Sequence, residues 1–156
     1  MDIGLMCAIL GAALAIGGGG IGSSVGVGLA GEVAAGVVAE DPDKFGKTLL
    51  LQALPGTQGI YGFLVAFWVI LKTNLLGGAL PVSSEAGLQI LFACLPMAIG
   101  GVISGIYQGR VAAAGIAMVG RKPDEVGKGL ILAAMVETYA VLGLLMSILL
   151  LMNIRL

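Results

Sequence analysis

The chain has 156 residues, of which 58% are hydrophobic and 11% are charged, and its formal net charge is −1. Soluble domains average about 45–50% apolar and about 25% charged residues, so this composition excludes a water-soluble globular protein and indicates an integral membrane protein. The chain has no histidine, and Cys7 and Cys94 stand far apart, which excludes a zinc site and a cysteine–histidine catalytic pair.

Four stretches with almost no charged residues follow one another along the chain. They cover residues 3–31, 48–71, 86–109 and 129–154, of which only the last contains a charge, at Glu137. Each stretch reaches the roughly 20 residues that a helix needs to cross a ~30 Å hydrocarbon core. The sequence therefore predicts an all-α membrane protein with four transmembrane helices. These helices are expected at about residues 3–39, 43–73, 85–118 and 123–153.

The first predicted helix has small residues at four-residue intervals. They fall at 18, 22, 26, 30 and 34 and again at 20, 24 and 28, and the third helix repeats the pattern at 101, 105, 109 and 113. Such stripes let helix backbones approach closely. The partner is either another helix of the same chain or a second copy beside it in a ring. A cleavable signal peptide is the alternative for this segment, but Asp2 stands where a basic residue is expected.

The loops between the predicted helices differ in charge, which gives an orientation. The first loop, "AEDPDKFGK" (39–47), and the third, "GRKPDEVGK" (120–128), hold five basic residues together, while "TNLLGGALPVSSE" (73–85) holds none. By the positive-inside rule the first and third loops are expected in the cytoplasm, and both termini are expected outside.

The two basic loops also belong to an internal repeat. "DPDKFGKTLLLQ" (41–52) aligns with "KPDEVGKGLILA" (122–133), and "GEVAAGVVA" (31–39) aligns with "GRVAAAGIA" (109–117). The chain therefore reads as a duplicated helical hairpin, with repeats at 1–78 and 79–156 in the same topology.

The second predicted helix contains "LPGTQGIYG" (54–62), where helix-breaking and polar residues stand in an apolar span. Leu54, Thr57, Gln58 and Tyr61 follow at i, i+3, i+4 and i+7 and so share one helix face. Pro55 lacks a backbone N–H, which perturbs the helix and can free a carbonyl oxygen.

Glu137 is the acidic residue of the fourth span. It follows Lys128 by nine residues, which places it about 14 Å from the charged loop, near the middle of the bilayer. A carboxylate at this depth is costly and by default indicates a functional site. The alternative is a protonated Glu137 that donates a hydrogen bond for structural reasons only.

Oxygen atoms from three helices are expected to converge at the depth of Glu137. Gln58 and Thr57 come from the second helix and Gln108 from the third. Oxygen ligands without sulfur or imidazole suit a small hard cation. A single carboxylate neutralises a monovalent ion, which favours Na⁺ or H⁺ over a divalent ion. Because a proton needs only the carboxylate, the additional oxygens favour sodium.

These segments resemble a known family, the proteolipid rotor subunits (c or K) of V/A-type ATPases, and most closely its sodium-pumping bacterial members. The similarity runs through the glycine-rich first helix, "PDKFGK", "LQALPGTQGIYGF", "IYQGRVAAAGI" and "AAMVETYAVLG". It implies a non-catalytic, ion-translocating subunit in a ring of identical copies in a bacterial or archaeal plasma membrane. The partners that it implies are a stator subunit with a basic residue, the central stalk and membrane lipid, and no nucleic acid.

The resemblance also implies a set of ligands. The sodium ion would be held by the Leu54 carbonyl, Thr57, Gln58, Gln108 and Glu137, with Tyr61 hydrogen-bonding the carboxylate. The Leu54 carbonyl does not follow from Pro55 alone, because the missing N–H leaves the carbonyl of Leu51 free. A proton-carrying rotor subunit, a self-contained four-helix channel or carrier, and a purely structural four-helix protein stay open as alternatives.

Glu32 and Arg110 occupy equivalent positions in the repeat, deep in the two glycine-rich helices. Their similar depth predicts an ion pair between these helices, since unpaired charges are costly there. The alternative is that both face the lumen of a ring and contact lipid or a central partner.

Overall fold

The computed structural model describes residues 2–156, and the described chain is almost entirely helical. Four helical segments are long and apolar enough to cross a membrane, as predicted. The α-helices are α1 (Ile3–Glu40), α2 (Phe45–Ala53), α3 (Thr57–Lys72), α4 (Ser84–Arg121) and α5 (Val126–Asn153). Short 3₁₀ turns precede or interrupt them at Pro42–Lys44, Leu54–Gly56 and Pro123–Glu125, named η1, η2 and η3.

Local signals in the sequence set the ends of the long helices. The side chains of Asp2 and Ser83 accept hydrogen bonds from the first-turn backbone N–H groups of α1 and α4, which are otherwise unsatisfied. Pro42 and Pro123 begin the 3₁₀ turns after α1 and α4, where a missing N–H costs little. The duplicated Pro-Asp pairs therefore mark two equivalent helix reversals.

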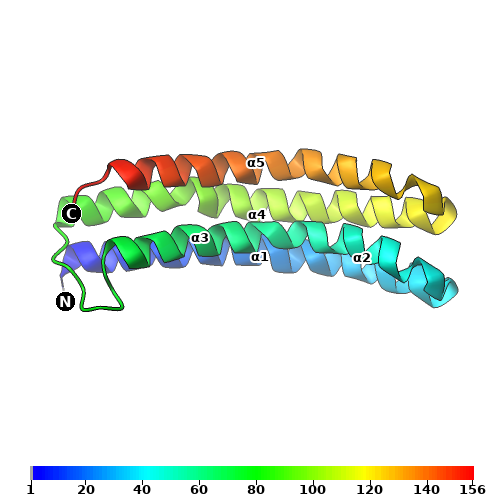
Figure 1. Ribbon diagram of the computed structural model, residues 1–156, viewed down its shortest axis with the longest axis horizontal. Coiled ribbons are helices and arrows are strands. Elements are labelled where there is room, and N and C mark those ends of the chain that lie inside the picture. The colour runs from blue at the N-terminus through cyan, green and yellow to red at the C-terminus, as the bar shows by residue number, and fades with distance from the viewer. Residues whose placement is uncertain (1) are drawn as a thin grey trace.

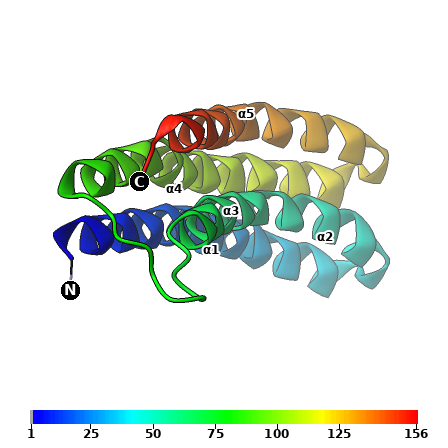
Figure 2. The ribbon, with the colours of Figure 1, turned by 60° about the vertical axis from the view of Figure 1, so that its left-hand side comes forward.

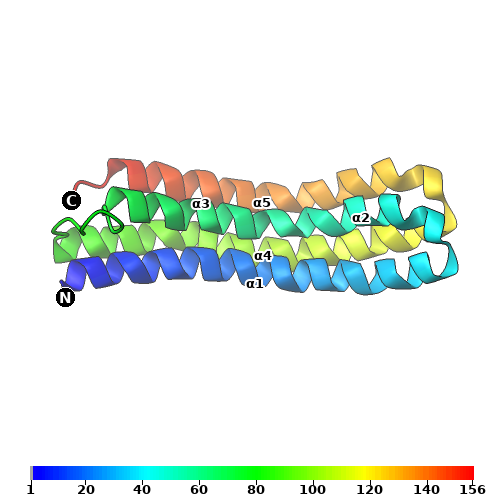
Figure 3. The ribbon, with the colours of Figure 1, turned by 60° about the horizontal axis from the view of Figure 1, so that its bottom comes forward.

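The helices form an elongated bundle with its two kinds of loop at opposite ends (Figure 1). Both termini and the α3–α4 link lie at one end, called here the terminal end, and the η1 and η3 turns lie at the other, called the loop end. α1 and α4 make the most extensive contact, α3 packs on α1, and α5 packs on α4. Figure 2 shows α5 beside α4 and α3 beside α1, and Figure 3 shows α3 and α5 on the same side of the α1–α4 pair.

The first small-residue stripe of α1 packs against α4 within the chain. Gly18, Gly22 and Gly26 lie so close to the α4 backbone that a Cβ atom on any of them would collide with the carbonyl of Ala98, Gly101 or Gly105. The intramolecular interpretation is thus correct for this stripe. On the second stripe, a Cβ atom at Gly20 or at Gly28 would meet no atom within 4 Å, so these two positions of α1 have no close partner within residues 2–156.

Two apolar cores occupy the two halves of the bundle. The core toward the terminal end includes Val65, Ile90 and Met97, and the core toward the loop end includes Leu51 and Ile116. Cys94 is a buried free thiol of the first core, and Cys7 is partly buried. The outer helix α5 buries least, since only 17% of its most apolar window is covered against 44% for α4. Its exposed apolar side chains suit contact with lipid.

The predicted ion pair between Glu32 and Arg110 is wrong for the single chain. Both residues are exposed, and the ion pairs found among residues 2–156 do not join them. The Arg110 guanidinium instead lies 5.2 Å from the ring centroid of Tyr107 on its own helix, a cation–π distance. Equal depth was the basis of the prediction, and depth alone does not bring two side chains to facing sides of their helices.

Candidate ion-binding site

The helix break at Pro55 is where the site begins. Pro55 cannot donate a backbone hydrogen bond, and the chain tightens into the η2 turn before α3 resumes at Thr57. In this turn the Leu54 carbonyl accepts the backbone N–H of Thr57, and the Thr57 hydroxyl donates to the same oxygen at 3.1 Å. The 3₁₀ geometry therefore brings the Leu54 oxygen, rather than that of Leu51, next to the Thr57 side chain.

Two fully buried amides connect this turn to the next helix. The Gln58 amide nitrogen donates to the Gln108 side-chain oxygen at 2.5 Å, and the Gln58 side-chain oxygen lies 3.4 Å from the Thr57 hydroxyl. Both glutamines have no exposed surface. Buried amides are costly unless they are hydrogen-bonded, so these contacts fix the relative positions of α3 and α4 at this level.

The Glu137 carboxylate receives a donor on each oxygen. The Tyr61 hydroxyl donates to one oxygen at 2.6 Å, and the Gln108 amide nitrogen donates to the other at 3.2 Å. Glu137 itself is partly buried between α3, α4 and α5. Hydrogen bonds to an ionised acceptor are stronger than those between neutral groups, so both donors hold the carboxylate in one orientation.

The structure thus brings all the predicted site residues into one connected group. Its hydrogen bonds run from Leu54 through Thr57, Gln58 and Gln108 to Glu137 and Tyr61. Pro55 is buried beneath it, facing Gly26 of α1. The group lies between the two apolar cores and provides one carboxylate among neutral oxygen and nitrogen atoms. Whether these residues hold an ion stays a prediction.

Two serines that the sequence analysis overlooked support the group. Ser104 accepts from the Gln58 amide at 3.2 Å and donates to the Val136 carbonyl at 3.0 Å, so it links α3, α4 and α5. Ser23 of α1 accepts the Gly59 backbone N–H at 2.7 Å. Ser104 stands four residues before Gln108 and therefore on the same helix face, which is the signal that could have identified it.

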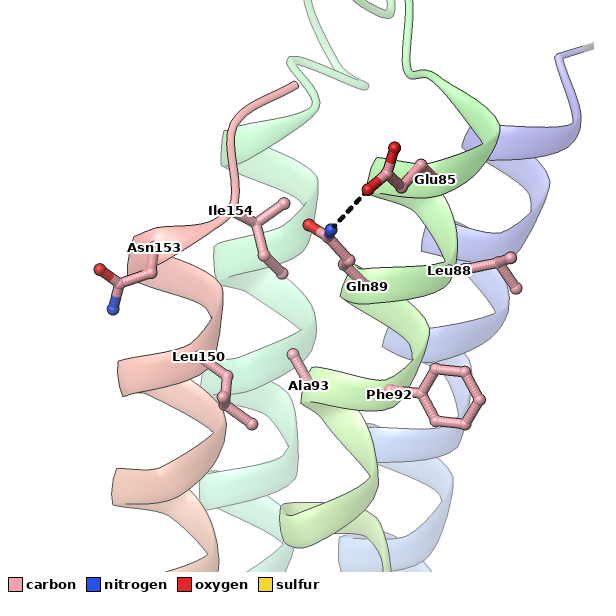
Figure 4. Close-up of a pocket in the computed structure, with 8 residues that line it drawn as sticks. All are labelled: Glu85, Leu88, Gln89, Phe92, Ala93, Leu150, Asn153 and Ile154. Carbon is pink, nitrogen blue, oxygen red and sulfur yellow. Dashed lines mark hydrogen bonds between the residues drawn. The ribbon is translucent and has the colours of Figure 1, made fainter.

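A separate groove lies at the terminal end between α4 and α5 (Figure 4). It has a volume of about 480 Å³, and Glu85 and Gln89 are hydrogen-bonded to each other at 3.4 Å on its wall. Asn153, another lining residue, lies about 24 Å along α5 from Glu137 at ~1.5 Å per residue. This groove is too far from Glu137 to belong to the candidate ion site.

Comparison with known proteins agrees with this arrangement. The sequence pattern of the ATP synthase C-subunit family matches residues 10–69 and again residues 91–150. The chain belongs to this family. The two matches fall on the two helical hairpins, so the duplicated hairpin fold is confirmed, and so is the multi-pass membrane character of the protein.

Two curated relatives are similar over nearly the whole chain. One is the V-type sodium ATPase subunit K of Enterococcus hirae, 50% identical over 150 residues that cover 96% of this chain and 93% of the relative. The other is the A-type ATP synthase subunit K of Methanocaldococcus jannaschii, 41% identical over 152 residues that cover 96% of this chain and 64% of the relative. The predicted resemblance to c/K rotor subunits of V/A-type ATPases is thereby confirmed.

Proposed function

We propose that this chain is the rotor-ring subunit that carries Na⁺ across the membrane in a rotary V/A-type ATPase, with Glu137 as its ion-carrying group. The observation that supports this best is the pairing of the Glu137 carboxylate with Tyr61 and Gln108 at the middle of the bundle. The name of the bacterial relative, a sodium ATPase subunit, supports sodium as the ion. The chain itself performs no covalent chemistry in this proposal.

Each site residue then has a physical task. Glu137 supplies the single negative charge that makes an occupied site neutral. A neutral site costs less free energy to move past lipid than a charged one. Thr57, the Gln58 side-chain oxygen and the Leu54 carbonyl supply neutral oxygens. Gln108 presents its amide nitrogen to Glu137, so it becomes an oxygen ligand only if its amide turns by half a rotation.

The surroundings of the ring follow from the same proposal. Identical copies stand around a common axis, the loop end faces the cytoplasm and the central stalk, and both termini lie outside a bacterial or archaeal plasma membrane. A basic residue of the stator competes with Na⁺ for Glu137 and releases it. The repeat units 1–78 and 79–156 provide one acidic site between them, because Gly56 stands where the first repeat would have its acid.

Carbodiimide labelling tests this proposal, because carbodiimides react with protonated carboxyl groups in apolar surroundings. Bound Na⁺ keeps Glu137 ionised, so sodium should slow its labelling and low pH should accelerate it. Purified rings are treated with a fluorescent carbodiimide across a sodium series at fixed pH, and the adduct is mapped by mass spectrometry. We expect labelling confined to Glu137 and slowed by Na⁺.

Potassium at the same concentration is the ion control, and Glu137→Gln is the labelling blank. Labelling of Glu137 that does not respond to sodium would replace this proposal with the proton-carrying alternative. Labelling spread over Glu32 and the acids of the loops would remove the case for a special carboxyl group at position 137.

Replacing Ser104 with alanine should weaken sodium binding without removing any proposed ligand. The change deletes the hydroxyl that holds the Gln58 amide and the Val136 carbonyl, and one such hydrogen bond contributes about 1 kcal/mol, or about fivefold in affinity. Calorimetric titration of purified rings measures it. Ser24→Ala is the matched control, because Ser24 is exposed and donates only to the Ile21 carbonyl of its own helix. Equal affinities in the two variants would exclude a role for Ser104 in positioning the site.

A further inference from the structure

The loop end of the bundle contains one junction between the two hairpins, and its contacts are specific. The Lys44 ammonium group donates to the Gly120 carbonyl at 2.8 Å. The Lys47 ammonium group lies 3.8 Å from the Asp124 carboxylate. Two lysines of the first loop thus reach across to the third loop (120–128), and both loops lie at the same end of the molecule (Figure 1).

Because the two hairpins are repeats, each residue of this junction has an equivalent residue in the other hairpin. In the alignment of 41–52 with 122–133, Lys47 corresponds to Lys128 and Asp43 corresponds to Asp124. Head-to-tail copies around a ring repeat the hairpin-to-hairpin junction between neighbouring copies. The equivalent of the Lys47–Asp124 pair is then Lys128 of one copy with Asp43 of the next.

Both members of this second pair are accessible in the single chain. The Lys128 side chain is 71% exposed, and its ammonium group pairs with the Glu125 carboxylate of its own loop at 2.6 Å. Asp43 is exposed, and the ion pairs found among residues 2–156 leave it without a cationic partner. Lys128 has three donors, so it can keep Glu125 and bind a second carboxylate.

The charges around these residues are reversed between the two loops. Three aligned positions are acidic, acidic and basic in the first loop and basic, basic and acidic in the third. The aligned pairs are Glu40 with Arg121, Asp41 with Lys122, and Lys44 with Glu125. Adjacent loops around a head-to-tail ring therefore carry opposite charges at these three positions.

The outward charges of both loops are available for such a contact. Glu40, Arg121 and Lys122 are exposed and belong to none of the ion pairs in the described chain. Asp41 pairs with Lys44 at 3.1 Å, and this hydrogen bond holds the pKa of Asp41 below its usual value. Asp41 therefore keeps its negative charge at neutral pH and adds to the acidic side.

A groove lies next to each of these two loops, between the helices that the loop connects. A groove of about 620 Å³ lies between α4 and α5, and its walls combine small apolar residues with the basic ones. It is lined by Ala114, Ala117, Met118, Arg121, Lys122, Glu125 and Lys128. On the first hairpin a groove of about 270 Å³ between α1 and α2 is lined by Gly31, Ala34, Ala35, Val38, Phe45, Thr48 and Gln52. Gly20 and Gly28, which have no close partner within residues 2–156, lie on the same helix as this second groove.

We propose that the third loop (120–128) of one copy of this chain docks against the first loop (39–47) of the next copy, with Lys128 paired to Asp43 of the next copy. This inference rests on the ring of the proposed function. Head-to-tail order places the third loop of each copy beside the first loop of the next copy.

Cross-linking in native membranes tests the contact directly. Exposed ion pairs contribute little stability, so the distance between the two residues is a more sensitive test than the stability of the ring. In one variant Asp43 and Lys128 are both replaced by cysteine, and in the matched control Lys47 and Asp124 are replaced. After treatment with a short bismaleimide we expect the first variant to form a ladder of covalent multimers and the control to keep the mass of one chain. The parent chain, treated in the same way, shows any cross-linking through the native Cys7 and Cys94.

Charge reversal provides the second measurement on purified rings. Lys128→Asp should lower the temperature at which rings dissociate, and adding Asp43→Lys should restore it. Monomer-mass products from the Asp43/Lys128 variant, in rings of normal mass, would overturn this contact while leaving the rotor proposal intact. The absence of any large closed oligomer of the parent chain would overturn both. Loss of stability in Lys128→Asp rings that Asp43→Lys does not restore would also overturn the contact.

Discussion

Replacing Glu137 with glutamine should abolish measurable sodium binding while the helix bundle stays folded. Glutamine has nearly the same shape as glutamate and can still accept the Tyr61 hydroxyl, which donates to Glu137 at 2.6 Å. The change removes the negative charge and replaces the oxygen that accepts the Gln108 amide with an NH2 group. A unit charge at 4 Å from a monovalent cation contributes about 4 kcal/mol at an effective dielectric constant of about 20, so affinity should fall by about a thousandfold.

Calorimetric titration of purified rings with NaCl measures this change, and circular dichroism of the same sample reports the helices. Thr138→Val is the matched control. Thr138 is the next residue on α5, is exposed, and donates only to the Met135 carbonyl at 2.8 Å. Sodium affinity should be unchanged in this control. Undiminished binding by Glu137→Gln would show that the ion is held elsewhere.

The fold could be predicted because lipid constrains both composition and length. The charge-free runs located four spans, and Pro42 and Pro123 marked the two reversals at the loop end. The spacing of small residues predicted close packing but left the partner open. In the structure Gly22 belongs to the α1–α4 contact, whereas Gly20 has no neighbour. Both stripes have the same spacing, so only the three-dimensional arrangement separates them.

The sequence predicted the depth of the site residues in the membrane better than the directions in which their side chains point. Counting residues from the charged loops placed Gln58, Gln108 and Glu137 at one level, and the structure brings them together. The same counting failed for Glu32 and Arg110, because two residues at one depth can point to different sides. Facing directions depend on how the helices pack, and this information is spread over many apolar residues.

Finer features of the site depend on the backbone at Pro55. A missing N–H predicts a free carbonyl four residues earlier, at Leu51. The chain instead forms the η2 turn, in which Thr57 donates to Leu54. A 3₁₀ turn bonds residues three apart rather than four, so the relevant carbonyl moves along the chain. Amide orientation is likewise set by neighbours, since the Gln108 nitrogen faces Glu137 because Gln58 occupies its oxygen.

Gly26→Ala and Gly28→Ala should change stability in opposite directions, although the two glycines are two residues apart on α1. A Cβ atom at Gly26 would collide with the Gly105 carbonyl and lie 2.7 Å from the Pro55 Cβ atom, whereas one at Gly28 would meet nothing within 4 Å. Overpacking costs about 1–3 kcal/mol, and a backbone carbonyl cannot move aside cheaply. Gly28→Ala should stabilise α1 by about 0.4–1 kcal/mol, because it restricts the unfolded chain. Thermal unfolding of detergent-purified protein measures both changes.

The same pair of variants links packing to ion binding. Pro55 packs against α1 at Gly26 and lies in the η2 turn, between Leu54 and the helix start at Thr57. A methyl group at position 26 pushes this turn away from α1, so it should displace the Leu54 carbonyl and the Thr57 hydroxyl and lower sodium affinity. Gly28→Ala leaves the turn in place and should bind sodium normally. If Gly26→Ala is as stable as Gly28→Ala and binds sodium equally well, the close approach of α1 and α4 at Gly26 does not hold the site.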